Sequence, residues 1–231
     1  LDVRMYARQA CTNVRALLLK LLDAKPLYTA EAFRKYESKE ALFQFMDDID
    51  WAKNPWLGSH LGAGLYASML LTGTSTDEWE DLYFEWLDTN ADPETGLWKR
   101  GFLEGAPRFH YLAATFHYVF NYEHAKRALP YPKALLDTCI QAYRDGACID
   151  FAKEVGWPDI DFAYLLARVQ RRAGTRYEET QQILREIADG LIHQLRADGD
   201  SRWLFIAQGH KAPNPDVPHG QFVSIRVTGE Y

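Results

Sequence analysis

Apolar residues recur at intervals of three and four along most of the chain, which is the spacing of one face of an α-helix. The segment 58–71 is apolar on nearly all sides and should be buried. Two other segments open with capping boxes, Ser75 to Glu78 and Thr175 to Glu178. Only 221–227 has the composition of a strand. The pattern therefore predicts an all-α protein with helices over 3–22, 30–46, 58–71, 75–87, 108–125, 130–144, 158–174 and 175–195.

The helices fall into pairs, and a similar turn follows three of the pairs. "DPETGLW" begins at Asp92, "DGACIDF" at Asp145 and "DGDSRWLF" at Asp198, so the three aspartates are 53 residues apart. Asp bonds its own backbone in turns of this kind, and we expect these residues to form turns and not to catalyse. A fixed period of this size predicts repeated helical hairpins that stack into a solenoid or close into a ring.

Helix pairs joined by these turns resemble the repeats of α/α-toroid proteins over about residues 40–205. That superfamily includes squalene-cyclase and prenyltransferase-like proteins, and carbohydrate-active enzymes such as polysaccharide lyases and sugar epimerases. The resemblance implies a toroid of about four hairpins over 1–205, with a ring that is open or is completed by another chain or domain. Residues 206–231 match no hairpin and are expected to form an irregular C-terminal tail or lid.

Composition narrows the classes of partner. The net charge of -6 argues against nucleic acid, which usually needs a basic face. No apolar run approaches the roughly 20 residues of a membrane span, and the charged, amphipathic start is unlike a signal peptide. Cys11, Cys139 and Cys148 have no metal-ligand spacing, and we interpret them as reduced thiols of a cytoplasmic protein.

In a ring, the loops from each outer helix to the next inner helix share one rim. Large residues gather in these segments, and a rim of this kind suits a ligand pocket. We expect a small-molecule or saccharide ligand to bind Trp56, Trp98, Arg108, Trp157, Tyr164 and Trp203. For Trp98 and Trp203 the simpler alternative is that the indole closes the end of a hairpin.

The candidate catalytic residues are His60, His110, Asp150 and Asp161. His60 lies among small residues in "GSHLGAG", and the two aspartates lie in the acidic stretch "CIDFAKEVGWPDIDF". Histidine is the side chain that changes protonation near neutral pH, and carboxylates in unlike environments can act as acid and base.

A histidine stripe follows His110, because His117 and His124 come at intervals of seven residues. That spacing places them on one helix face but about 10 Å apart along the axis, too far to share a metal ion. We expect His117 and His124 to be structural, and we expect neither a metal nor a cofactor.

Three functions remain open from the sequence. The first is an enzyme that acts on a carbohydrate or another polar, ring-containing molecule by hydrolysis, elimination or epimerisation. The second is a non-catalytic binding or scaffold module of a larger protein. The third is an isoprenoid or terpenoid enzyme with an aromatic cavity, although the acidic motifs of those enzymes are missing.

Overall fold

The computed structural model describes residues 18–24, 31–98, 108–147 and 157–197. Within these ranges the chain is helical with connecting turns, and none of it forms a strand. All-α is therefore the correct fold class for the described chain. The helices are α2 (Glu31–Arg34), α3 (Lys39–Asp47), α4 (Pro55–Leu71), α5 (Asp77–Asn90), α6 (Arg108–Ala125), α7 (Pro132–Arg144), α8 (Trp157–Ala173) and α9 (Tyr177–Ala197).

Several helix starts differ from the sequence prediction: α4 begins at Pro55 and not at 58, α7 at Pro132 and not at 130, and α9 at Tyr177 and not at 175. The predicted helix 30–46 is broken into α2 and α3, because Ser38 caps α3 by accepting a hydrogen bond from the Ala41 amide. Helix α5 is capped by Thr76, one residue after the predicted Ser75, and the Thr76 hydroxyl accepts from the Trp79 amide. The predicted strand 221–227 and the tail 206–231 lie outside the described residues.

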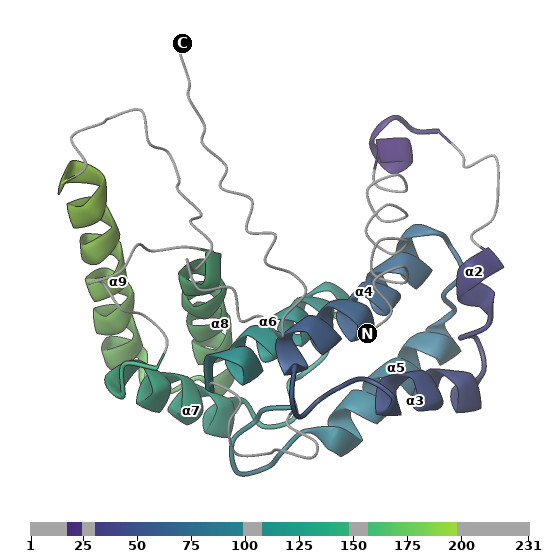
Figure 1. The fold of residues 1–231 in the computed structure, drawn as a ribbon, viewed down its shortest axis with the longest axis horizontal. Helices are drawn as coiled ribbons and strands as arrows, with labels where there is room; N and C mark the ends of the chain where they lie inside the picture. Colours follow the sequence, from purple (N-terminus) through teal and green to yellow (C-terminus); the bar gives the residue numbers. More distant parts are fainter. Residues whose placement is uncertain (1–17, 25–30, 99–107, 148–156, 198–231) are drawn as a thin grey trace.

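The helices form an arc (Figure 1). Helices α4, α6 and α8 lie along its hollow side, and α3, α5, α7 and α9 form a second row on its outer side. We call the sides of α4, α6 and α8 that turn away from the second row the inner face. Early residues of one inner helix contact early residues of the next, and later residues contact later ones, so these helices run parallel. The pairs are Ser59 with His117 and Tyr66 with His124 between α4 and α6, and Phe116 with Tyr164 and Glu123 with Arg172 between α6 and α8.

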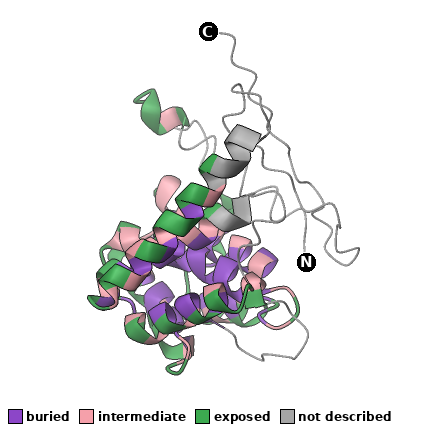
Figure 2. Cartoon of the chain, turned by 90° about the vertical axis from the view of Figure 1, so that its left-hand side faces the viewer, coloured by how far each residue is buried: buried purple, intermediate pink, exposed green. Residues whose placement is uncertain are grey.

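An aromatic core fills the space between the two rows, where the buried residues concentrate (Figure 2). Trp51 stacks on both Trp86 and Tyr118, with ring centroids 5.2 and 5.3 Å apart. Buried indoles need a partner for their N–H, and these find one: Trp51 donates to the Met46 carbonyl at 2.7 Å and Trp98 to the Leu87 carbonyl at 2.8 Å. The core is therefore both apolar and directional, because the indoles of Trp51 and Trp98 are each hydrogen-bonded to a backbone carbonyl.

The "DPETGLW" turn fastens the second pair of helices to the third. The Asp92 carboxylate accepts from the Glu94 amide at 3.1 Å and from the Thr95 hydroxyl at 2.6 Å, so Asp92 forms the turn. Gly96 adopts φ +71°, and an added Cβ there would lie 2.5 Å from Leu135 of α7. Asp145 has a different position, because it is itself the C-cap of α7 and binds Arg108 at 2.6 Å.

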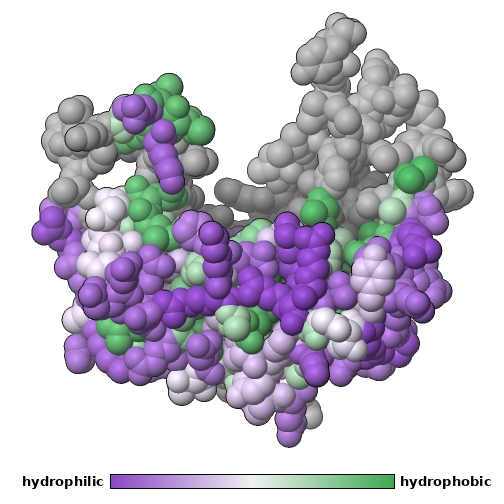
Figure 3. Space-filling view, turned by 180° about the vertical axis from the view of Figure 1, so that it is seen from behind, coloured by the Kyte–Doolittle hydropathy of each residue, from purple (hydrophilic) through white to green (hydrophobic). Residues whose placement is uncertain are grey.

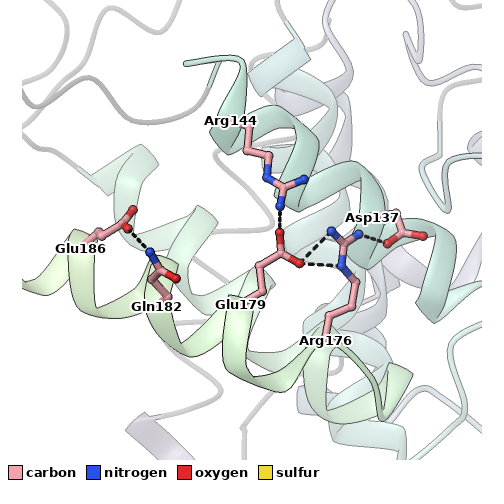
Figure 4. A network of polar contacts seen from close by, with 6 residues as sticks. All are labelled: Asp137, Arg144, Arg176, Glu179, Gln182 and Glu186. Atoms are coloured by element: carbon pink, nitrogen blue, oxygen red, sulfur yellow. Dashed lines mark hydrogen bonds and ion pairs between the residues drawn. The ribbon is translucent and has the colours of Figure 1, made fainter.

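Charged residues connect the outer helices. Glu179 of α9 binds both Arg144 of α7 and Arg176, and Arg176 also reaches Asp137 (Figure 4). Pairs on an exposed surface contribute little stability each, typically about 0–1 kcal/mol. The face shown in Figure 3 is accordingly mostly hydrophilic, with hydrophobic residues in smaller patches.

Across the described ranges, each helix is too short or too polar to cross a membrane.

Helices α4 and α6 approach each other closely at Gly62 of α4. A Cβ at this position would overlap the Tyr118 hydroxyl oxygen and would lie 3.0 Å from Ile49 Cδ1. The Tyr118 ring cannot move away easily, because it is fully buried between Trp51 and Trp98. The absence of a side chain at Gly62 therefore sets the distance between α4 and α6.

We expect Gly62→Ala to lower the free energy of unfolding, because overpacking a rigid core costs about 1–3 kcal/mol and the better helix propensity of Ala returns only about 1 kcal/mol. Tyr118→Phe removes the obstructing hydroxyl group. This hydroxyl makes no hydrogen bond to another described residue, so its removal should change stability little. Urea denaturation of the two single variants and the double variant measures the coupling. The cost of Gly62→Ala should shrink or disappear in the Tyr118→Phe background; an equal cost in both backgrounds would contradict the proposed contact.

Candidate functional site

A cluster of histidine and aromatic side chains lies where α4 and α6 meet on the inner face. Helix α4 begins at Pro55, whose fixed backbone angle suits a first helical position. Its next turn carries Trp56, Ser59 and His60, and α6 contributes His110 and His117 opposite them. Ser59 is buried, whereas Trp56 and the three histidines keep part of their surface exposed. A ligand on the inner face can therefore reach these rings.

Ser59 determines which nitrogen of His117 carries the proton. The Ser59 hydroxyl donates to the Trp56 carbonyl at 2.5 Å, and its oxygen lies 2.8 Å from His117 Nδ1. A hydroxyl has only one proton to donate. Because Ser59 donates it to the Trp56 carbonyl, the Ser59 oxygen can only accept a hydrogen bond from the His117 ring. His117 is then the Nδ1–H tautomer, and its Nε2 lone pair remains available to accept a proton.

His60 packs against His117, with ring centroids 4.2 Å apart. Burial holds the pKa of His117 well below the ordinary value for histidine, and the neighbouring His60 lowers the pKa further. Two imidazolium ions at this separation would repel each other. Near neutral pH His117 is therefore a neutral base with a second imidazole beside it.

Trp56 connects this pair to His110. Its ring centroid lies 6.0 Å from that of His60 and 5.9 Å from that of His110, and Phe109 meets it edge-on at 6.2 Å. The structure thus brings two predicted catalytic residues, His60 and His110, into contact with one predicted binding residue. An aromatic ring beside polar groups is a usual lining for a site that holds a ligand with both apolar and hydrogen-bonding faces.

Other predicted residues lie elsewhere. Trp98 is 1% exposed and stacks on Tyr122 in the core. Arg108 pairs with Asp145 on the outer side of α6. Tyr164 and the half-buried Asp161 belong to α8, where Tyr164 contacts Phe116 on the inner face. Asp150, Trp203 and the Trp157 side chain fall outside the described residues and side chains.

Sequence reasoning missed Ser59 and undervalued His117. His117 was expected to be structural because it lies two helical turns from the helix start. The usable signal was its register with His110 on the same face of α6, together with the small residues of "GSHLGAG", which allow α6 to come close. That His60 would meet His117 and not His110 depends on the offset between the two helices, which no local pattern contains.

A cavity of about 850 Å³ lies at another place, between the "DPETGLW" turn and α7. Its walls include Arg108, Arg144 and Arg176, each already paired with a carboxylate. None of the inner-face histidines lines it. We place the candidate site at the histidines, because His60 and His117 contact each other there and the pKa of His117 is lowered by burial and by His60.

Among the described residues, no three histidine, cysteine or acidic side chains are grouped as metal ligands. Comparison with known proteins adds no constraint: no protein-family model matches the chain, and neither a curated protein nor a solved structure is significantly similar to it. The site must therefore be interpreted from its own geometry.

The lowered pKa of His117 makes stability depend on pH in a definite direction. Below about pH 6.5, the unfolded chain takes up a proton at this residue and the folded chain does not. The free energy of unfolding should therefore fall as the pH decreases, by up to about 1.4 kcal/mol per pH unit, until the folded protein also binds the proton. Above about pH 6.5 both states are neutral at His117 and the effect vanishes.

Urea titrations between about pH 7.5 and pH 5 test this dependence against His117→Asn, whose amide can still donate to Ser59 but does not titrate. The variant should have a flatter pH profile. His124→Asn, on the same helix but exposed, serves as the control and should keep the slope of the unmodified protein. Identical slopes for His117→Asn and the unmodified protein would show that His117 is not held neutral.

Proposed function

We propose that the chain is an enzyme that moves a proton on a polar, ring-containing substrate such as a saccharide, at the inner-face site of Trp56, His60, His110 and His117. The observation that carries this proposal is the 4.2 Å contact between His60 and His117, with Ser59 holding the Nδ1 side of His117. Burial makes the His117 imidazole costly to protonate, and a second imidazole, His60, lies against it. Perturbed pKa values of this kind cluster at functional sites.

The chemistry of the pair favours proton abstraction and return. His117 offers a lone pair at Nε2, and His60 lies against it as the proposed proton donor. A base and an acid a few ångströms apart suit the removal of a proton from a ring carbon followed by elimination or by return to the other face. Hydrolysis of a glycosidic bond usually uses two carboxylates instead, so we favour elimination or epimerisation over hydrolysis.

The aromatic surroundings suit a sugar ring. A pyranose has an apolar C–H face and a rim of hydroxyls, and it matches a wall of rings with hydrogen-bonding groups at the edge. Trp56 and Phe109 supply such a wall next to His60 and His110. With the sugar stacked on Trp56, His60 and His110 would be within reach of the hydroxyls at its rim.

An open α/α toroid is the architecture we propose for the whole chain. The parallel course of α4, α6 and α8 and the second row behind them support it (Figure 1). In such a ring the inner helices would face the central space, and the histidine cluster between α4 and α6 would line it. Completion of the ring by another chain or domain remains part of this proposal.

The test is a panel of neutral and acidic mono- and oligosaccharides, assayed for binding by calorimetry and for turnover by product analysis. His60→Gln and His117→Asn should lower turnover of any accepted saccharide by about 10²-fold or more, the usual size of a general acid or base contribution. Their free energies of unfolding at about pH 7.5 should stay within about 1 kcal/mol of the unmodified protein.

His124→Gln is the matched control, since it removes an exposed histidine from the same helix and should leave turnover unchanged. Binding without turnover would favour the scaffold or binding module over the enzyme. Turnover that survives both site substitutions would place the chemistry elsewhere. A panel in which no saccharide binds would refute the proposed substrate class.

A further inference from the structure

The aromatic surface of the inner face continues from the histidines onto α8. His117 neighbours Phe116 on α6, with centroids 5.2 Å apart, and Phe116 meets both Phe120 at 4.4 Å and Tyr164 of α8 at 5.3 Å. Phe120 and Tyr164 are themselves 4.8 Å apart. Phe120 is 39% exposed, which is unusual for a phenylalanine at the junction of two packed helices. The rings therefore form a platform that a ligand at the histidines would reach next.

A guanidinium group borders this platform. Arg168 lies over the Tyr164 ring, with its central carbon 4.9 Å from the ring centroid. Its side chain is 37% exposed, so it can face both the ring and a ligand. Stacking on an aromatic ring leaves the N–H groups at the edge of the guanidinium plane free to point outward.

The charge of Arg168 is only partly balanced. The carboxylate nearest to it, Glu123, lies 3.8 Å away and binds Arg172 more closely, at 2.8 Å. Arg172 also donates to the Arg127 carbonyl, so Arg172 is the partner that holds Glu123 in place. Among the described residues one carboxylate thus serves two arginines, which leaves one positive charge in excess beside the Phe120 and Tyr164 rings.

We infer that Phe120, Tyr164 and Arg168 form a second subsite, which takes an acidic ring of an oligomeric ligand whose neighbouring ring lies at the histidine pair. This inference rests on the proposed function. The rings provide the stacking surface, and Arg168 provides a forked donor for a carboxylate or sulfate group. The substrate class is then an acidic oligosaccharide, and a neutral or single-ring sugar should bind more weakly.

The experiment measures calorimetric affinities at low salt for four probes: a trigalacturonate, its methyl ester, a sulfated chondroitin disaccharide and monomeric galacturonate. The unmodified protein should bind at least one acidic oligomer about tenfold or more tightly than the methyl ester and the monomer, as one ion pair of about 1.4 kcal/mol would give. The chondroitin disaccharide carries a uronate carboxylate as well as its sulfate, so tighter binding of this probe than of the trigalacturonate would indicate that the sulfate is recognised.

Arg168→Gln should abolish the preference for the acidic probes while leaving affinity for the neutral ester unchanged. Arg185→Gln removes the same charge from an exposed position of α9 and should keep the preference. Tyr164→Leu, which retains an apolar side chain, should weaken the oligomers without affecting the monomer. Circular dichroism confirms that each variant is folded.

Each outcome has a separate meaning. Equal affinity for acidic and neutral probes, or an acidic preference that survives Arg168→Gln, overturns the second subsite while the proposed function stands. Equal effects of Tyr164→Leu on monomer and oligomers overturn it as well. If the unmodified protein binds no probe of any kind in this set or in the wider saccharide panel, the proposed function fails and the subsite with it.

Discussion

The contact between Gly62 of α4 and Tyr118 of α6 sets the geometry on which the candidate site depends. Without a side chain at Gly62, the Tyr118 hydroxyl occupies the space where a Cβ would stand. Close approach of parallel helices at this level carries Ser59 and His60 to within contact of His117, one turn away. A wider separation would leave the same three side chains present but unable to share a hydrogen bond or a proton.

The core behind this contact is stiff because its large rings are also hydrogen-bonded. Trp51 is bound to the Met46 carbonyl and Trp98 to the Leu87 carbonyl, and Tyr118 is packed against both rings. Burial raises the pKa of Tyr118, so its phenol remains neutral and compatible with the apolar core. Rigidity of this kind is what a site needs when a displacement of about 1 Å can cost a large part of its activity.

The two rows of helices carry different kinds of side chain. The outer row carries charge pairs such as Lys39 with Glu85 and Arg144 with Glu179, which face water and contribute mainly solubility. The inner row carries imidazoles and partly exposed rings, and the Glu123 carboxylate there is shared by Arg168 and Arg172. A polar outer surface and an aromatic inner face are the observations that favour the hollow of the arc for the proposed ligand.

The sequence by itself determined the helices and much of their order. The spacing of apolar residues located α6 and α7 close to their observed bounds, because proline and the apolar stripe act within one turn. Local chemistry also identified Asp92 as a turn former, since its carboxylate accepts hydrogen bonds from Glu94 and Thr95 two and three residues on. It failed at Ser38, where a side-chain cap interrupted a pattern that looked continuous over 30–46.

Only the tertiary structure decided which histidines meet. His60 and His117 are 57 positions apart in the sequence, and their contact depends on the register between α4 and α6, which is fixed by how Gly62 receives Tyr118. The same holds for Trp98, whose place in the core follows from a carbonyl of α5 and a ring of α6. Periodicity indicates which face of one helix is apolar, but it contains no information about the position of one helix along the axis of another. A shift of one turn between α4 and α6 would bring a different residue of α6 against His60 in place of His117.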